Sequence, residues 1–151
     1  MPFIHKTAIV ETPAIGKRTK IWHWTHVMPK VRIGEDCILG QNVFVGNNVI
    51  IGDKVKIQNN VSLYDGVIIE NCVFIGPSVV FTNVKHPRAD QEQKDNFRTT
   101  LVRRGAVIGA NATIICGVEI GSGAFVGAGA VVTKNVLAGT TVVGNPAKEL
   151  K

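Results

Sequence analysis

The chain has 151 residues, a formal net charge of +6 and a hydrophobic fraction of 45%. This length supports one domain with a substantial core, and no apolar run approaches the roughly 20 residues of a membrane-spanning helix. We identify no signal-peptide segment at the N-terminus. The three cysteines lack CxxC spacing, which argues against a disulfide framework and favours a reducing compartment. We therefore expect a single domain over residues 1–151, located in the cytoplasm.

From Ile9 to Phe81, a bulky apolar residue recurs at every sixth position, and smaller residues such as Val43 and Val55 form a second track four positions later. Ile and Val together number 38, against five Leu. Because β-branched side chains favour extended backbone, the strict period predicts a short strand and a corner repeated at fixed length. We expect an all-β parallel solenoid with three hexads in each turn of about 18 residues.

The phase breaks after Phe81 and resumes at Ile108, out of register by half a repeat. The segment 84–100 between them is polar, contains Pro87 and has no periodicity. We expect it to project as a loop, and long loops in compact folds usually serve a function. Its charge is mostly basic, which also fits a solvated loop, but only Phe97 offers an aromatic ring for nucleic-acid stacking.

The repeat decays after Val136. Residues 137–151 therefore predict a short C-terminal cap, since an open β edge invites aggregation. We expect residues 147–151 to form a short helical end.

The [Ile/Val/Leu]-Gly-x-x-[small apolar]-x hexads resemble those of hexapeptide-repeat acyltransferases, whose fold is a left-handed parallel β-helix. Longer motifs resemble nucleotide-sugar N-acetyltransferases that act on 3-amino sugars: QNVFVGNNVIIGDKVKIQNNVSLYDGV (41–67), IGPSVVFTNVKHPRA (75–89), LVRRGAVIGANATIICGVEIG (101–121) and GAFVGAGAVVTKNV (123–136). Within that group the chain most resembles the UDP-2-acetamido-3-amino-2,3-dideoxyglucuronate N-acetyltransferases of surface-polysaccharide (O-antigen) synthesis. Related enzymes acting on dTDP-3-amino-3,6-dideoxyhexoses often carry Asn-Asp after Phe-Thr, where this chain has Asn83-Val84, and this favours the UDP-uronate substrate.

The resemblance implies acetyl transfer from acetyl-CoA to a sugar amine, within a homotrimer whose active sites lie between subunits. An amine beside electron-withdrawing substituents is substantially neutral near neutral pH, so the protein must mainly align the amine and polarise the thioester carbonyl. The chain has no Gly-x-Ser-x-Gly elbow, which disfavours a covalent acyl-enzyme. We expect no metal, no nucleic acid and no membrane partner.

Asn83 is the first catalytic candidate, because it lies where the loop leaves the repeat and the family has an important Asn in this motif. His86 is the classical base candidate, or else a ligand contact. Arg88 suits a sugar carboxylate or a pyrophosphate, and we group Lys85 with it as a substrate contact.

Polar side chains also recur near the corners of the repeat. Tyr64, Asp65, Gln41 and Asn60 are candidates for contacts to the sugar or the uracil, although stacked amides are ordinary in solenoids. The family binds pantetheine along the later coils, which here implies Gly109, Ala110, Gly127 and Ala128. Candidate contacts to the phosphates of CoA are Arg103, Arg104, Lys134 and Lys148.

Two other function classes remain open. A γ-type carbonic anhydrase on the same solenoid needs three histidines around zinc, and the four histidines of this chain are poorly spread for that purpose. A non-enzymatic scaffold or binding module predicts no loop with concentrated chemistry.

Overall fold

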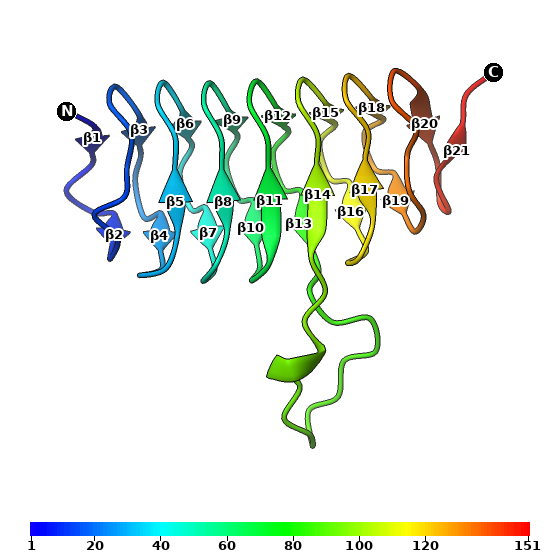
Figure 1. Ribbon diagram of the computed structural model, residues 1–151, viewed down its shortest axis with the longest axis horizontal. Helices are drawn as coiled ribbons and strands as arrows, with labels where there is room; N and C mark the ends of the chain where they lie inside the picture. The colour runs from blue at the N-terminus through cyan, green and yellow to red at the C-terminus, as the bar shows by residue number, and fades with distance from the viewer.

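The computed structural model describes residues 1–151 as an elongated stack of short strands (Figure 1). Parallel pairing joins Lys20 to Ile38 and Ile38 to Lys56, so one coil takes 18 residues and contains three hexads. The strands form three sheets of nine, seven and five strands, which make the three sides of the stack. The predicted parallel β-helix is therefore confirmed.

We call the three sides sheets A, B and C. Sheet A contains β1 (Phe3–Ile4), β3 (Lys20–Ile21), β6 (Ile38–Leu39), β9 (Lys56–Ile57), β12 (Phe74–Ile75), β15 (Val107–Ile108), β18 (Phe125–Val126), β20 (Thr141–Val143) and β21 (Lys148–Glu149). Sheet B contains β2 (Ile9–Val10), β4 (His26–Val27), β7 (Phe44–Val45), β10 (Ser62–Leu63), β13 (Val80–Phe81), β16 (Thr113–Ile114) and β19 (Val131–Val132). Sheet C contains β5 (Arg32–Ile33), β8 (Ile50–Ile51), β11 (Val67–Ile69), β14 (Thr100–Val102) and β17 (Glu119–Ile120). The chain passes each coil through the A–B, B–C and C–A corners in turn.

Both apolar tracks point into the stack. Val55 and Ile57 are fully buried, while Lys56 between them is exposed, as the alternation of side chains along a strand requires. A single apolar cluster of 33 buried residues runs along the stack. Burying each Val or Ile contributes roughly 1.5–3 kcal/mol, so this cluster is the main source of stability.

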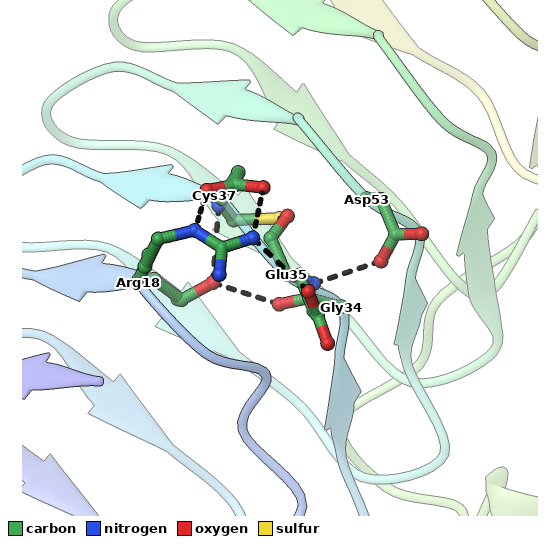
Figure 2. Close-up of polar contacts among 7 residues, drawn as sticks. Arg18, Gly34, Glu35, Cys37 and Asp53 are labelled. Atoms are coloured by element: carbon green, nitrogen blue, oxygen red, sulfur yellow. Dashed lines mark hydrogen bonds and ion pairs between the residues drawn. The ribbon is translucent and has the colours of Figure 1, made fainter. Parts of the chain in front are cut away.

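Polar contacts join successive coils at the C–A corner (Figure 2). The Glu35 backbone N–H donates to the Asp53 carboxylate at 2.8 Å, and the Arg18 guanidinium binds the Glu35 carboxylate at 3.1 Å. Cys37 lies just inside this corner, where its thiol donates to the Gly52 carbonyl at 3.0 Å. Burial raises the pKa of the Cys37 thiol.

The glycine that opens a corner is required by close approach between coils. A Cβ added to Gly76 would lie 2.7 Å from the backbone nitrogen of Ala110 in the next coil. Positive φ falls two residues later, and it is often carried by asparagine, as at Asn42 (φ 56°) and Asn60 (φ 60°).

The first repeat departs from the predicted phase. Val10, not Ile9, pairs with the buried Val27, and Ile9 is 60% exposed. The expectation that Ile9 points inward is therefore wrong. The corner that contains Pro13 is one residue shorter than the others, so the sixfold phase begins at Ile15, which bridges to Ile33.

The expected loop leaves the B–C corner and projects from one side of the stack (Figure 1). Val67 pairs with Thr100, 33 residues on, where Ser62 and Val80 pair 18 apart, so this coil contains 15 extra residues. Thr100 is buried in β14, so the projecting segment ends at Thr99, and Val102 resumes the phase one hexad before Ile108. The loop contains the chain's one helical segment, the 3₁₀ turn η1 (Lys94–Asn96), and no helix is long and apolar enough to cross a membrane.

The C-terminal cap is a strand and not a helix. β21 runs antiparallel to β20, which itself pairs with β18. The Ala147 N–H donates to the Val131 carbonyl, and the Leu150 N–H donates to the Thr141 carbonyl, each at 2.8 Å. The expected helical end over residues 147–151 is wrong, because the last coil offers this segment hydrogen-bond partners that an isolated five-residue helix lacks.

Candidate active site

The loop spans residues 82–99 and leaves the B–C corner; one hydrogen bond closes its neck, and two others tie the neck to the next coil. The Asn83 carbonyl accepts the Arg98 N–H at 2.9 Å, which joins the outgoing and returning chain. The hydroxyls of Thr82 and Thr100 accept backbone N–H groups of the next coil at 3.0 and 3.2 Å. Asn83 is half-buried and lies just beyond β13, where the loop leaves the stack.

Beyond the neck, the loop encloses an open hollow of about 400 Å³. Its lining consists of Val84, Lys85, His86, Gln93, Asp95, Asn96, Phe97 and Arg98. Two of the predicted site residues, Lys85 and His86, therefore share one concave surface with the cationic Arg98. The walls are polar, and the cations Lys85 and Arg98 outnumber the one carboxylate, Asp95, so the hollow suits an anionic, hydroxyl-rich ligand.

Arg88, also predicted to bind substrate, faces an acidic neighbour within the loop. Its guanidinium binds the Asp90 carboxylate through two hydrogen bonds of 3.0 and 2.9 Å. This contact raises the pKa of Arg88 and lowers that of Asp90. Both side chains are more than half exposed, so the pair is weak.

The four other substrate candidates divide between two corners. Tyr64 and Asp65 lie at the B–C corner, one coil before Asn83, whereas Gln41 and Asn60 lie at the A–B corner. The Asn60 side-chain carbonyl accepts a hydrogen bond from Asn42 at 2.9 Å, as in the ladders that corner amides form in solenoids. One chain therefore places Tyr64 and Asp65 at the corner of the loop, and it places Gln41 and Asn60 across sheet B from it.

The candidates for pantetheine binding stack at the A–B corner. Gly109 and Gly127 each open a corner, followed by Ala110 and Ala128. This strip of small residues leaves main chain accessible at Gly109 and Ala110, which are half-buried, and at Ala128, which is exposed, whereas Gly127 is buried beside Val143 of β20.

The candidate phosphate contacts are dispersed. Arg103 and Arg104 lie at the C–A corner, Lys134 lies at the B–C corner, and Lys148 lies in β21. One chain does not bring these four residues together.

Arg103 is already engaged between coils. Its Nη1 and Nε donate to Glu70 and Glu119, each at 2.9 Å, which raises the pKa of Arg103. The Arg104 backbone N–H also donates to Glu70, at 2.8 Å, and together with Arg103 lowers the pKa of that carboxyl. The Arg104 side chain is exposed and forms no ion pair, so it is the better phosphate candidate of the two.

The four histidines do not gather. The His5 and His23 rings stack with centroids 3.6 Å apart, His26 contacts Glu11 at 2.9 Å, and His86 lies in the loop. Nowhere in the chain do three His, Cys, Asp or Glu side chains gather in a way that could hold a metal ion. One chain therefore does not form the three-histidine zinc centre that a carbonic anhydrase requires.

Sequence reasoning overlooked Gln93, Thr82 and Thr100. The two threonines hold the neck, and Gln93 contacts both His86 and Arg88 across the loop. The periodicity of the repeat cannot predict the contacts of Gln93, because the loop is aperiodic. Threonines on both sides of the break in the repeat, such as Thr82 and Thr100, do indicate where the neck lies.

Comparisons with known proteins agree with the repeat and with the place of the loop. The family model "bacterial transferase hexapeptide (six repeats)" matches residues 12–47, 48–83 and 99–134, which leaves out the projecting loop. The dTDP-3-amino-3,6-dideoxy-α-D-galactopyranose 3-N-acetyltransferase of Aneurinibacillus thermoaerophilus is 49% identical over 146 residues, covering 97% of this chain and 76% of that enzyme.

Solved structures share the fold. An acetyltransferase of Vibrio cholerae complexed with acetyl-CoA is 30% identical, with a TM-score of 0.63 and coverage of 75% of this chain and 69% of that one. A variant of the GDP-perosamine N-acetyltransferase of Caulobacter crescentus is 20% identical, with a TM-score of 0.67 and coverage of 99% and 56%, and it supports the fold alone.

The parallel β-helix of 18-residue coils and the match to the hexapeptide family model define the class as hexapeptide-repeat transferases. This chain belongs to the bacterial transferase hexapeptide family, and it is an acetyltransferase. The resemblance read from the sequence is confirmed at this level.

Proposed function

We propose that the chain transfers the acetyl group of acetyl-CoA to the 3-amino group of a nucleotide-linked amino sugar. The observation that carries this proposal is the identity of 49%, over 97% of the chain, to an enzyme named for 3-N-acetylation of a dTDP-amino sugar. The acetyl-CoA in the Vibrio cholerae structure supports the donor.

The reaction needs alignment more than activation. The neutral amine attacks the thioester carbonyl carbon, the C–N bond forms, the C–S bond breaks, and the proton lost by the amine neutralises the departing thiolate. In the proposal the Asn83 side chain orients the amine from the neck of the loop, and His86 carries this proton from the amine to the thiolate or contacts the sugar. This division suits a half-buried amide on the stack and an exposed imidazole on the loop.

We further propose a homotrimer whose active sites lie between subunits. The dispersion of the candidates supports this, because the loop leaves the B–C corner while the Gly109 and Gly127 strip lies at the A–B corner. A neighbouring chain that places its A–B corner against the loop completes the site. Sedimentation equilibrium should give a mass of three chains, and a stable monomer that retains full activity would contradict the shared site.

For the sugar, we propose UDP-2-acetamido-3-amino-2,3-dideoxyglucuronate. The support is Val84 at the position where related dTDP-sugar enzymes often carry Asp, together with the cationic Lys85 and Arg98 in the hollow, which suit a uronate carboxylate. The second candidate is a dTDP-3-amino-3,6-dideoxyhexose, favoured by the relative that is named for such a substrate.

A panel of UDP- and dTDP-linked 3-amino sugars, assayed with acetyl-CoA for release of free thiol, tests the function. The expected result is the highest kcat/KM with the UDP-uronate. Activity with the dTDP-6-deoxy sugars alone would select the second candidate. Stoichiometric zinc by metal analysis, or no affinity for CoA by calorimetry, would overturn the acetyltransferase proposal in favour of the carbonic anhydrase or scaffold hypothesis.

A further inference from the structure

Gln93 joins the two arms of the loop through one side-chain amide. Its Nε2–H donates to the His86 carbonyl at 3.0 Å, and its Oε1 accepts the Arg88 N–H at 2.7 Å. Gln93 is half-buried, while His86 and Arg88 are exposed. Although Gln93 precedes η1 directly, its side chain forms no capping hydrogen bond there. The amide is therefore committed to the opposite arm of the loop.

The two bonded groups, the His86 carbonyl and the Arg88 N–H, are set two residues apart and bind one amide, which is the arrangement found along one side of an extended segment. In such a segment the carbonyl of one residue and the N–H of the second residue after it point to the same side. Pro87, between them, has no N–H and a φ fixed near −65°. The carboxamide of Gln93 supplies one acceptor and one donor, so it takes the place that a neighbouring strand would occupy.

We propose that Gln93 is a positioning residue that holds the His86–Arg88 segment over the hollow of the loop. Through the two backbone contacts it fixes where the imidazole of His86 and the guanidinium of Arg88 can meet the sugar. The inference rests on the proposed function, which assigns this segment to the sugar. Gln93 acts through the segment and does not touch the reacting atoms.

Two variants and a matched control test the proposal. Gln93→Ala removes both hydrogen bonds, whereas Gln93→Glu keeps the acceptor for Arg88 but turns a carboxylate toward the His86 carbonyl. Gln91→Ala is the control, because Gln91 is an exposed glutamine of the same loop whose side chain makes no hydrogen bond.

With the nucleotide sugar that the wild type acetylates best, both Gln93 variants should raise the KM for the sugar and lower kcat/KM about 10- to 100-fold. The KM for acetyl-CoA should change less than about twofold, because Gln93 bonds to the segment assigned to the sugar and not to the candidate CoA strip. In a chain that already carries His86→Ala and Arg88→Ala, adding Gln93→Ala should change kcat/KM less than about threefold. An equal loss in both backgrounds, or Gln93→Ala kinetics equal to those of Gln91→Ala, would overturn the proposal.

Limited proteolysis separates this proposal from the proposed function. Trypsin should cleave after Arg88 about 10-fold faster in Gln93→Ala than in Gln91→Ala, since loss of the two hydrogen bonds of the Gln93 side chain favours local opening of the loop. A wild-type chain that acetylates no sugar of the panel defeats the proposed function. The cleavage rates still decide whether Gln93 holds the loop, and equal rates in the two variants would overturn its positioning role.

Discussion

Gly109 and Ala128 approach so closely that a Cβ built on Gly109 would lie 2.5 Å from the backbone nitrogen of Ala128. The position of a Cβ is fixed by the backbone, and the atom it would meet belongs to the main chain, so no side-chain rotation can relieve the contact. The glycine that recurs at the start of the corners therefore reflects the spacing between coils.

Gly109→Ala should lower the free energy of unfolding by about 1–3 kcal/mol, because the added methyl group forces two coils apart. Gly129→Asn is the matched control. Gly129 has φ 72° with nothing within 4 Å of its Cβ position, and Asn42, Asn60 and Asn111 adopt similar φ. The control should stay within about 0.5 kcal/mol of wild type in urea unfolding. Equal stability of Gly109→Ala and wild type would contradict the close approach.

Arg103 and Arg104 should separate a structural role from a cofactor role. Arg103→Met leaves the carboxylates of Glu70 and Glu119 without their shared cation, so the thermal midpoint should fall while the KM for acetyl-CoA stays unchanged. Arg104→Ala should leave the midpoint unchanged and raise the KM for acetyl-CoA several-fold. An unchanged KM in Arg104→Ala removes Arg104 from the phosphate contacts.

Acid should weaken the coil contacts made by Glu70. The Arg104 N–H and the Arg103 guanidinium lower the pKa of Glu70 below its ordinary value of 4.5. A lowered carboxyl pKa contributes stability that is present above pH 4.5 and lost as pH falls through the folded-state value. Glu70→Gln should therefore flatten the fall of the thermal midpoint between about pH 5 and pH 3. Glu92→Gln, in the exposed loop, should retain the wild-type pH dependence, and a matching slope in Glu70→Gln would refute the assignment.

Asn83→Ala should reduce kcat about 100-fold, as expected for the loss of one oriented hydrogen-bonding group at a reacting centre. The thermal midpoint should not change, because the hydrogen bond that closes the neck uses the Asn83 backbone carbonyl and not its side chain. Thiol release measures the rate, and calorimetry with CoA checks that the donor still binds. Unchanged turnover would exclude Asn83 from the mechanism.

The sequence predicts the stack well because its rule is local. The sixfold period alone predicts that Val55 and Ile57 are buried and that Lys56 between them is exposed, whatever the position of their coil in the stack. The rule fails at Ile9, where the short corner at Pro13 shifts the phase by one residue. It also fails at residues 147–151, where partners on the last coil determine the conformation.

The candidate site is less predictable for the same reason. The phase break locates Asn83 at the neck of the loop, but the engagement of Arg103 depends on Glu70, a full coil and a loop away in the sequence. The contacts of Gln93 depend on how an aperiodic segment folds back on itself. Neither contact recurs at a fixed spacing, so the repeat pattern of the sequence does not predict it.

The extra residues of the loop enter and leave at adjacent points of one corner, and β14 still pairs with β11 and β17 in the regular register. The register of the coils therefore depends on where the two ends of this insertion lie, and not on its length or sequence. His86, Arg88 and Gln93 all lie within this insertion, outside the strands of the three sheets. Loops of other lengths and sequences should therefore be accepted between Thr82 and Thr100 while the coils on either side keep their register.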